Sequence, residues 1–397
     1  MGDNRKMELP LYSNKLNVKK FENLLSNNDQ GYKFFWLEAI MKLIPNGNDL
    51  FTFEDVINEM IVSAWKTVTH YHLRLGHTVN GNAENFLEHA IRLLYGNAKT
   101  ELKNKVPSRD RLLYLIGKYN DVLEADKIHL TDYVPYRLIK PFMDKEGKAY
   151  IDSKNYGRFI AYLNAFTKID NEFFYDIVEA DSSLKRRIHI NEEWREFMMQ
   201  NYAVIMGWIR YNKAIFIQDR NPGVPGVMYK IAPEMEAKHK SLKAARELWI
   251  ATVQLTGRPL HEIYTGRELD INSFDLDHFV PRSYVSNDEL WNLSPTTKNI
   301  NSMKGNQLPN LYENFERLAE LQHKALMMCN DYEIVRDKFK ICLDYHVNSI
   351  EIRNSLYQSN MDLQSYKERL YNVIQPVYDS AKMSGFTEWI PRKQRWK

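Results

Sequence analysis

The side chains best suited to chemistry lie in residues 274–309. Asp275 and Asp277 are two positions apart, so their carboxylates share a face if Phe274–Val280 forms a strand. His278 follows directly, and a histidine that is neutral near pH 7 can take a proton from a water molecule. These residue types suit hydrolysis in which an activated water attacks phosphorus.

Two further polar residues follow at helical spacing. Asn301 and Lys304 are three apart and share a face if a helix begins near Lys298. The Asp277 carboxylate and the Asn301 amide oxygen are hard donors, which suit Mg²⁺ or Mn²⁺ better than zinc. Such a metal would polarise the scissile phosphate and stabilise the leaving oxygen. Lys304 would add positive charge as the pentacovalent phosphorus develops.

A strand, a loop, a second strand and a helix must position these side chains. Pro281 ends the first strand because it has no N–H to donate to a partner strand. A polar loop leads to a short second strand at about Leu293–Pro295, and Thr296 or Thr297 caps the helix that follows. We expect Asn292 to bridge backbone groups across the loop and so fix the distance between strand and helix.

The motifs of this segment resemble those of the HNH, or ββα-metal, nucleases. The run D-x-D-H-x-x-P at residues 275–281 precedes Asn292-Leu293 and Asn301-x-x-Lys304, in that family's order and spacing. The nearest likeness is to the HNH domain of the RNA-guided type II CRISPR nucleases, which also lacks a zinc knuckle. The resemblance covers only about 50 of the 397 residues.

The resemblance implies a role for each matching residue. Asp277 and Asn301 would be metal ligands, with Mg²⁺ or Mn²⁺ as the cofactor, and His278 would be the general base. Asn292 would be the middle, structural asparagine, and Asp275 an auxiliary acidic residue. The reaction would be hydrolysis of DNA to a 3′-hydroxyl and a 5′-phosphate, with RNA not excluded as a substrate.

Three cations are candidates for contacts with nucleic acid: Arg282, Lys298 and Lys304. The whole chain has 54 basic and 51 acidic residues and a net charge of +3, so any phosphate-binding surface must be a local patch. The expected function is a metal-dependent HNH endonuclease in restriction or anti-phage defence. The alternatives are an effector subunit activated by a sensor or ATPase partner, and a catalytically silent nucleic-acid-binding scaffold.

The composition excludes several other classes of protein. With 44% hydrophobic and 26% charged residues the chain is expected to fold rather than remain disordered. Cys329 and Cys342 are the two cysteines and no C-x-x-C occurs, so neither a disulfide framework nor a cysteine zinc site is expected. The N-terminal residues lack the apolar stretch of a signal peptide, and no apolar run reaches transmembrane length, so a cytoplasmic protein is expected. The sequence also lacks the phosphate-binding GxxxxGK[ST] loop and the GxSxG elbow.

The fold class predicted from periodicity is mostly α. We expect a helical domain at 1–220, a linker and connecting helix at 221–257, a ββα nuclease element at 258–310 and a helical region at 311–397. Within these, helical periodicity is seen in the following runs: Tyr32–Ile44, Glu84–Tyr95, Arg109–Tyr119, Asn155–Phe166, Trp194–Ile217, Met235–Thr256, Glu333–Tyr345 and Leu363–Ile374. Short strands are expected at Ala149–Ile151 and Ile263–Arg267. Because the ββα element has no cysteine pairs, flanking helices must support it. The oligomeric state does not follow from the sequence.

Overall fold

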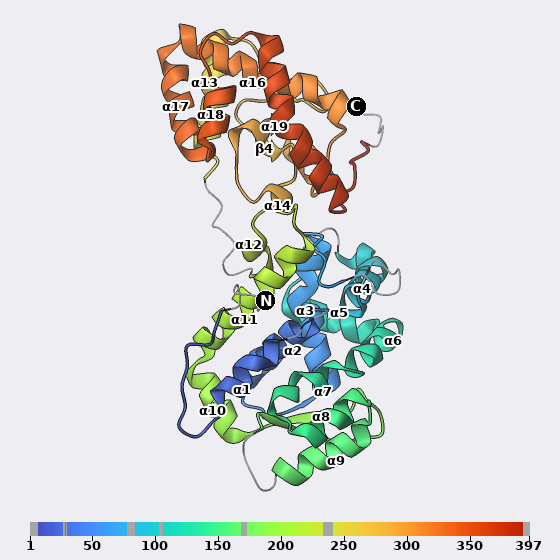
Figure 1. Cartoon of the computed structure of the whole chain (residues 1–397). Helices are drawn as coiled ribbons and strands as arrows, with labels where there is room; N and C mark the ends of the chain where they lie inside the picture. The colour runs from blue at the N-terminus through green and yellow to red at the C-terminus, as the bar shows by residue number, and fades with distance from the viewer. Residues whose placement is uncertain are drawn as a thin grey trace. The chain divides into compact units, whose positions relative to one another are not determined.

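The computed structural model describes residues 7–26, 28, 30–77, 84–102, 106–167, 173–232 and 241–391 (Figure 1). The chain divides into two compact units. The first unit comprises residues 1–222 with 230–233, and the second comprises residues 223–229 with 234–397. Most described residues are helical, as predicted. Among the described helices, none is both long enough and apolar enough to cross a bilayer.

The first unit contains many helices and one small sheet. Its elements are α1 Val18–Glu22, η1 Asn23–Leu25, α2 Tyr32–Leu43, η2 Ile44–Asn46, β1 Leu50–Thr52, α3 Phe53–Thr69, α4 Phe86–Leu102, α5 Arg109–Lys118, α6 Asn120–Thr131, α7 Val134–Leu138, η3 Lys140–Phe142, α8 Lys145–Asp152, α9 Tyr156–Thr167, β2 Tyr175–Val178, β3 Arg187–Ile190, α10 Glu192–Gln200 and α11 Tyr202–Arg220.

Helices α2 and α3 lie side by side in the core of the first unit (Figure 1). Trp36 of α2 is completely buried and packs edge-on against Phe53 of α3. Helix α3 starts with a capping box: the Thr52 hydroxyl accepts the Asp55 N–H, and the Asp55 carboxylate accepts the Thr52 N–H. The periodic apolar residues therefore form helices that bury their apolar faces against each other.

One sequence expectation for the first unit was wrong, and one expected helical run is divided in two. Ala149–Ile151 is helical, within α8, because the Asp144 side chain accepts the Gly147 N–H and caps a helix there. The run Trp194–Ile217 is two helices that meet at Asn201. In addition, the structure contains an antiparallel sheet, β1-β3-β2, that was not predicted; in it Ile177 pairs with Ile188.

The second unit combines a two-stranded sheet with helices from both sides in the sequence. Its elements are α13 Lys243–Thr256, β4 Asp275–His278, α14 Arg282–Val285, η5 Leu290–Asn292, β5 Leu293–Thr296, α15 Lys298–Lys304, α16 Leu311–Asp331, α17 Glu333–His346, α18 Ile350–Leu356 and α19 Leu363–Met383. The short helix α12, Val227–Ile231, lies where the two units divide the chain. The helix expected from Met235 is observed from Lys243, and residues 233–240 lie outside the described residues.

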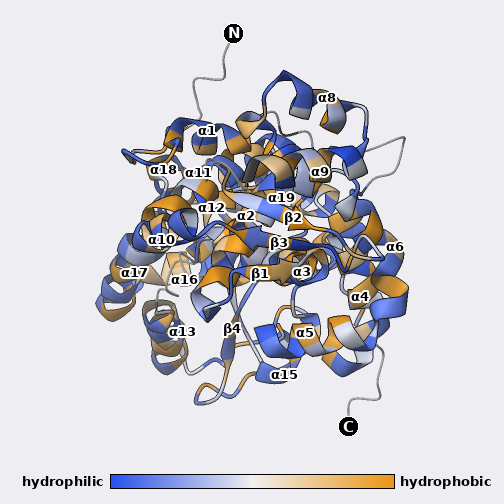
Figure 2. Cartoon of the chain, turned by 90° about the horizontal axis from the view of Figure 1, so that it is seen from below, coloured by the Kyte–Doolittle hydropathy of each residue, from blue (hydrophilic) through white to orange (hydrophobic). Residues whose placement is uncertain are grey.

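Helices pack tightly around the strands of the second unit. Helix α13 packs against α17 and β5, and α16 packs against α17 and α19. In Figure 2 ribbons such as α17 alternate between apolar and polar residues, as amphipathic helices do. The strand predicted at Ile263–Arg267 was wrong: this stretch is a turn, closed by an isolated bridge between His261 and Glu268. Gly266 takes a left-handed conformation there, with φ of 73°.

Candidate active site

Strands β4 and β5 form the base of the candidate site. They pair antiparallel with Asp277 opposite Ser294 and His278 opposite Leu293. Beyond His278 the pairing continues through Asn292, which is fully buried. Its side-chain oxygen accepts the Val280 N–H at 2.7 Å, and its amide donates to the Val280 carbonyl at 2.8 Å. Asn292 thus makes the backbone bridge expected of it and fixes the chain just after His278.

Helix α15 lies across β4. Its first turn is capped by Thr297, whose hydroxyl accepts the Ile300 N–H at 3.2 Å. Asn301 and Lys304 project from one face of this helix, as their spacing predicts. The Asn301 amide donates to Asp275 Oδ2 at 3.3 Å, and Lys304 Nζ donates to the His278 carbonyl at 2.7 Å.

The Asp277 carboxylate is buried and contacts two donor side chains. Lys304 Nζ lies 3.2 Å from Oδ1 and 3.1 Å from Oδ2 of Asp277, and only 1% of Lys304 is exposed. The Tyr264 hydroxyl donates to Asp277 Oδ2 at 2.5 Å. Burial, together with the neighbouring Asp277 carboxylate, raises the pKa of Tyr264 well above its usual range, so this phenol remains a donor. A cation and a phenol therefore hold Asp277 in one orientation.

His278 is held by a second carboxylate. Its Nε2 lies 2.8 Å from Asp288 Oδ1, and the same oxygen accepts from Arg282 Nε at 2.9 Å. Burial alone would raise the pKa of Asp288, but hydrogen bonds and charge from His278 and Arg282 outweigh it and lower the pKa to about 2. Asp288 is therefore ionised near neutral pH and can accept hydrogen bonds from His278 Nε2 and Arg282 Nε.

Asp275 lies at the more open end of the site. Its side chain is 41% exposed and has Arg246 of α13 on one side, with Nη2 3.6 Å from Oδ1. The Asn301 amide is on its other side. The Arg246 guanidinium also stacks on the Phe274 ring, at 4.7 Å from the centroid, and donates to the Phe274 carbonyl. Asp275 thus connects α13 with α15.

Buried polar side chains tie the surrounding loops to the strands. Glu262 is 1% exposed; it accepts both the N–H groups of Tyr264 and Thr265 and the hydroxyl of Thr296 at the end of β5. The Gln322 amide of α16 donates to three main-chain carbonyls of the η5–β5 segment, those of Leu290, Trp291 and Leu293.

The C-terminal part of the second unit also contacts the site. The Trp389 ring packs edge-on against Tyr264 with centroids 5.4 Å apart. The main-chain N–H of Trp389 donates to the Leu308 carbonyl at 2.6 Å, next to a parallel bridge between Leu308 and Glu388. Helices and loops outside residues 258–310 therefore supply much of the support that this segment needs.

Residues 262–310 match a sequence model of the HNH endonuclease family. The second unit carries an HNH domain. No curated protein and no solved structure matches the chain. The HNH domain suggests nuclease activity and implies a nucleic acid as the substrate.

Within the HNH domain, the structure brings most of the predicted site residues together. Asp277 and His278 lie on β4, and Asn301 and Lys304 reach this strand from α15. Asn301, however, contacts Asp275 directly. The acidic residue given only an auxiliary role thus lies next to the predicted amide ligand.

The three predicted phosphate contacts have different surroundings. Lys298 is exposed at the start of α15. Lys304 is buried against Asp277, and in this arrangement its charge balances a carboxylate of the protein. Arg282 is mostly buried, with its Nε on Asp288. Of these three cations, the surroundings favour phosphate binding only for Lys298.

Sequence reasoning missed three residues that contact side chains of the candidate site: Tyr264 and Asp288 within residues 262–310, and Arg246 of α13, which lies outside them. Tyr264 lies in a segment interpreted as a strand, and Arg246 lies in a helix assigned to the connection between domains. Asp288 is ten residues beyond His278 in a polar loop, where no periodicity predicts which side chain turns inward. A buried aspartate beside a histidine is visible only once the loop is folded.

The oxygen donors of the HNH domain fit a hard divalent cation. Asp277 and Asn301 offer carboxylate and amide oxygens, and Mg²⁺ typically keeps several waters, so it needs few protein ligands. No group of three or more His, Cys, Asp and Glu that could hold a metal occurs among the described residues. A site here would therefore depend on the Asn301 amide and on water.

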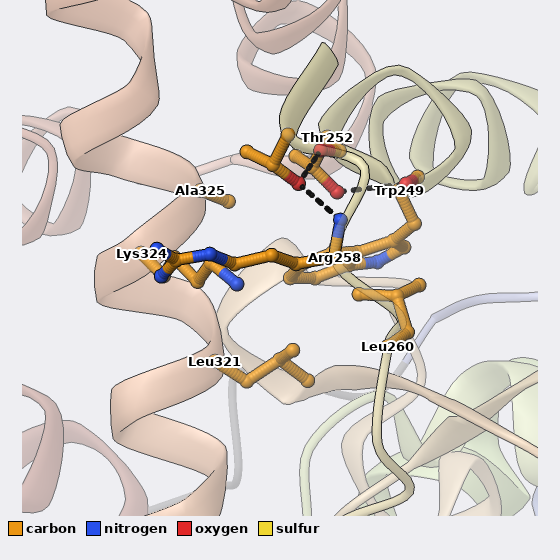
Figure 3. Close-up of a pocket in the computed structure, with 8 residues that line it drawn as sticks. Trp249, Thr252, Arg258, Leu260, Leu321, Lys324 and Ala325 are labelled. Atoms are coloured by element: carbon orange, nitrogen blue, oxygen red, sulfur yellow. Dashed lines mark hydrogen bonds between the residues drawn. The ribbon is translucent and has the colours of Figure 1, made fainter. Parts of the chain in front are cut away.

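A small pocket on the same unit lies between α13 and α16 (Figure 3). Figure 3 shows the long Arg258 side chain reaching toward Lys324. The volume of the pocket is about 10 Å³, enough for one water molecule. It is too small to hold a nucleotide.

Proposed function

We propose that this protein is a divalent-metal-dependent endonuclease that hydrolyses phosphodiester bonds in DNA. The observation that carries the proposal is the arrangement of Asp277, His278 and Asn301 on β4 and α15, within the segment that matches the HNH family. In one small site, a histidine can act as a general base, and a carboxylate and an amide can hold a metal ion for phosphodiester hydrolysis.

His278 acts as the general base in this proposal. Because its Nε2 faces Asp288, Nδ1 is the nitrogen that takes a proton from water. The water oxygen then forms a bond to phosphorus while the bond from phosphorus to the 3′-oxygen breaks. The 3′-oxygen leaves and is protonated by solvent, so the products carry a 5′-phosphate and a 3′-hydroxyl.

Asp277 and Asn301 would hold the metal, Mg²⁺ or Mn²⁺, with Asp275 beside them. When bound, the metal would polarise the phosphate and stabilise charge on the leaving oxygen. Tyr264 and Lys304 keep Asp277 oriented by donating to its carboxylate. Lys298, which is exposed at the start of α15, would contact a neighbouring phosphate of the DNA backbone.

Plasmid cleavage by the purified full chain tests this function. We expect nicking or cutting in Mg²⁺ or Mn²⁺ and none in EDTA. His278→Ala should lower kcat by roughly 10²–10⁴-fold, the usual contribution of a general base. Asn301→Ala should lower activity and raise the metal concentration needed for half-maximal rate. His261→Ala is the matched control, because His261 is exposed and lies outside the proposed chemistry.

Each outcome of this experiment has a defined meaning. Cleavage that survives in both His278→Ala and Asn301→Ala would contradict the site assignment. Cleavage of RNA in place of DNA would correct the substrate. Absence of cleavage by wild-type protein, with DNA binding retained, would favour a silent binding scaffold.

We further propose that the activity serves restriction or anti-phage defence. The support is the organisation of the chain: a nuclease segment is joined to a large helical unit that the family match does not cover. Phage plating on cells that express wild type or His278→Ala tests the role, and protection should require His278. If purified protein cuts only after an extract from infected cells is added, the effector-subunit alternative is favoured.

A further inference from the structure

His278 contacts a loop whose position is set from outside the family-matched segment. Asp288, which faces His278 Nε2, is only 5% exposed. Its main-chain carbonyl accepts from Nδ1 of His346 at 2.9 Å, and His346 is completely buried at the end of α17. The loop is therefore fixed through both the side chain and the backbone of Asp288.

The next residue of the loop is held at the same place. Glu289 is 8% exposed, and its Oε1 accepts from the Asn348 side-chain amide at 2.6 Å. Asn348 lies between α17 and α18. We use the term α17–α18 junction for residues 346–349. Two successive loop residues, Asp288 and Glu289, thus dock on this junction, which is far from β4 in the sequence.

We propose that Asp288 is the positioning residue for His278, and that the α17–α18 junction holds Asp288 in place. The proposal rests on the proposed function, in which His278 accepts a proton. In this proposal Asp288 accepts a hydrogen bond from Nε2–H and so favours the tautomer with Nδ1 unprotonated, which is the form that can accept a proton from water. It also limits rotation of the imidazole, since the ring is bonded to a buried carboxylate that cannot itself turn.

Two observations favour positioning over simple packing. A buried carboxylate without donors would be costly, but Asp288 has both Arg282 and His278 as donors on one oxygen. In addition, His346 holds Asp288 through its main-chain carbonyl, a contact that does not involve the imidazole of His278. A buried carboxylate held in place from both sides therefore faces His278 Nε2 and can orient the imidazole.

Steady-state cleavage by the full chain tests the kinetic consequence. We expect Asp288→Asn and His346→Phe each to lower kcat by about 10–100-fold with KM little changed, the size seen when a group that orients an active histidine or ligand is altered. His323→Phe is the matched control for His346→Phe. His323 also bonds a main-chain carbonyl in this unit, that of Met361, which lies outside the Asp288 loop. It should retain wild-type kcat.

A double mutant separates positioning from general loss of structure. In a His278→Ala background, Asp288→Asn should cause no further loss, because its effect passes through the missing imidazole. An additional loss equal to that in the wild-type background would overturn the proposal. So would wild-type kcat in Asp288→Asn.

Histidine ring ¹⁵N NMR tests the inference without any cleavage. Wild-type protein should show the His278 ring protonated on Nε2, with a signal that His278→Ala removes. Asp288→Ala and His346→Phe should convert it to a mixture of the two neutral tautomers. An unchanged ring signal in both variants would overturn the inference even if the protein cuts DNA. The expected change in a protein that never cuts would support the inference and count against the proposed function alone.

Discussion

At the scale of single residues, two buried carboxylates of the candidate site are held by different hydrogen-bond donors. Asp277 is held by Lys304 and Tyr264, whereas Asp288 is held by Arg282 and His278. Each carboxylate is buried and each has a cation within hydrogen-bond distance. Neither depends on a bound metal to balance its charge in the folded protein.

The Lys304–Asp277 pair predicts a stability effect. Lys304→Met should lower the free energy of unfolding by about 3–5 kcal/mol, because a buried carboxylate is left without its cation. Urea unfolding of the full chain, followed by far-UV circular dichroism, measures the change. Lys298→Met is the matched control, since Lys298 is exposed, and it should change stability by less than about 0.5 kcal/mol. Equal stability of the two variants would show that Lys304 contributes nothing to holding Asp277.

At the scale of elements, local patterns could be predicted from the sequence and distant contacts could not. The helix at Lys298–Lys304 and its Thr297 cap follow from local signals, and both are present in the structure. The strand β5 was expected one residue shorter than observed. Ala149–Ile151 was misread because Tyr150 and Ile151 are residue types common in strands, while the cap at Asp144 was overlooked.

The same limit applies to the candidate site. The order and spacing of Asp277, His278 and Asn301 could be recognised because they lie within one short segment. Arg246 and His346 come from helices well before and well after that segment, and their contacts exist only after the helices pack. No periodicity in the sequence encodes which side chain of a packed helix meets the site.

Helices α2 and α11 are linked by a buried ion pair that predicts a pH effect. Burial alone would raise the pKa of Glu38, but Lys213 and Lys42 outweigh it and lower the pKa from 4.5 to about 2. Since the folded-state pKa is lowered, the stabilisation is complete above about pH 4.5 and is lost as pH falls toward about 2.

Glu38→Gln should therefore lower the Tm most at neutral pH. At neutral pH the substitution should lower the free energy of unfolding by about 3 kcal/mol, the lower end for removing one partner of a buried pair. The difference in Tm from wild type should shrink as pH falls below about 4.5. Thermal unfolding from pH 3 to 7 gives the comparison. Glu124→Gln, at an exposed position of α6, should follow wild type throughout. A difference between Glu38→Gln and wild type that stays constant with pH would contradict the lowered pKa.

At the scale of the whole molecule, folding and catalysis should respond differently to metal removal. EDTA should abolish cleavage, but it should shift the Tm by less than about 2 °C, which corresponds to under about 1 kcal/mol for a unit of this size. The reason is that Lys304 and Tyr264 already satisfy Asp277. Thermal unfolding and cleavage in parallel Mg²⁺ and EDTA samples measure both. Unfolding of the second unit in EDTA would show that the metal has a structural role.

The contact between Trp389 and Tyr264 has a consequence for synthesis of the protein. Tyr264 donates to Asp277, and Trp389 packs against the Tyr264 ring. A ribosome makes Asp277 and His278 long before it makes Trp389, and domains complete their packing only when their last elements emerge. The unfinished chain therefore lacks the aromatic contact that packs against Tyr264, a donor to Asp277. Under the proposed function, a nascent chain would gain full activity only after its C-terminal helices leave the exit tunnel, which would limit damage to the DNA of the cell that makes it.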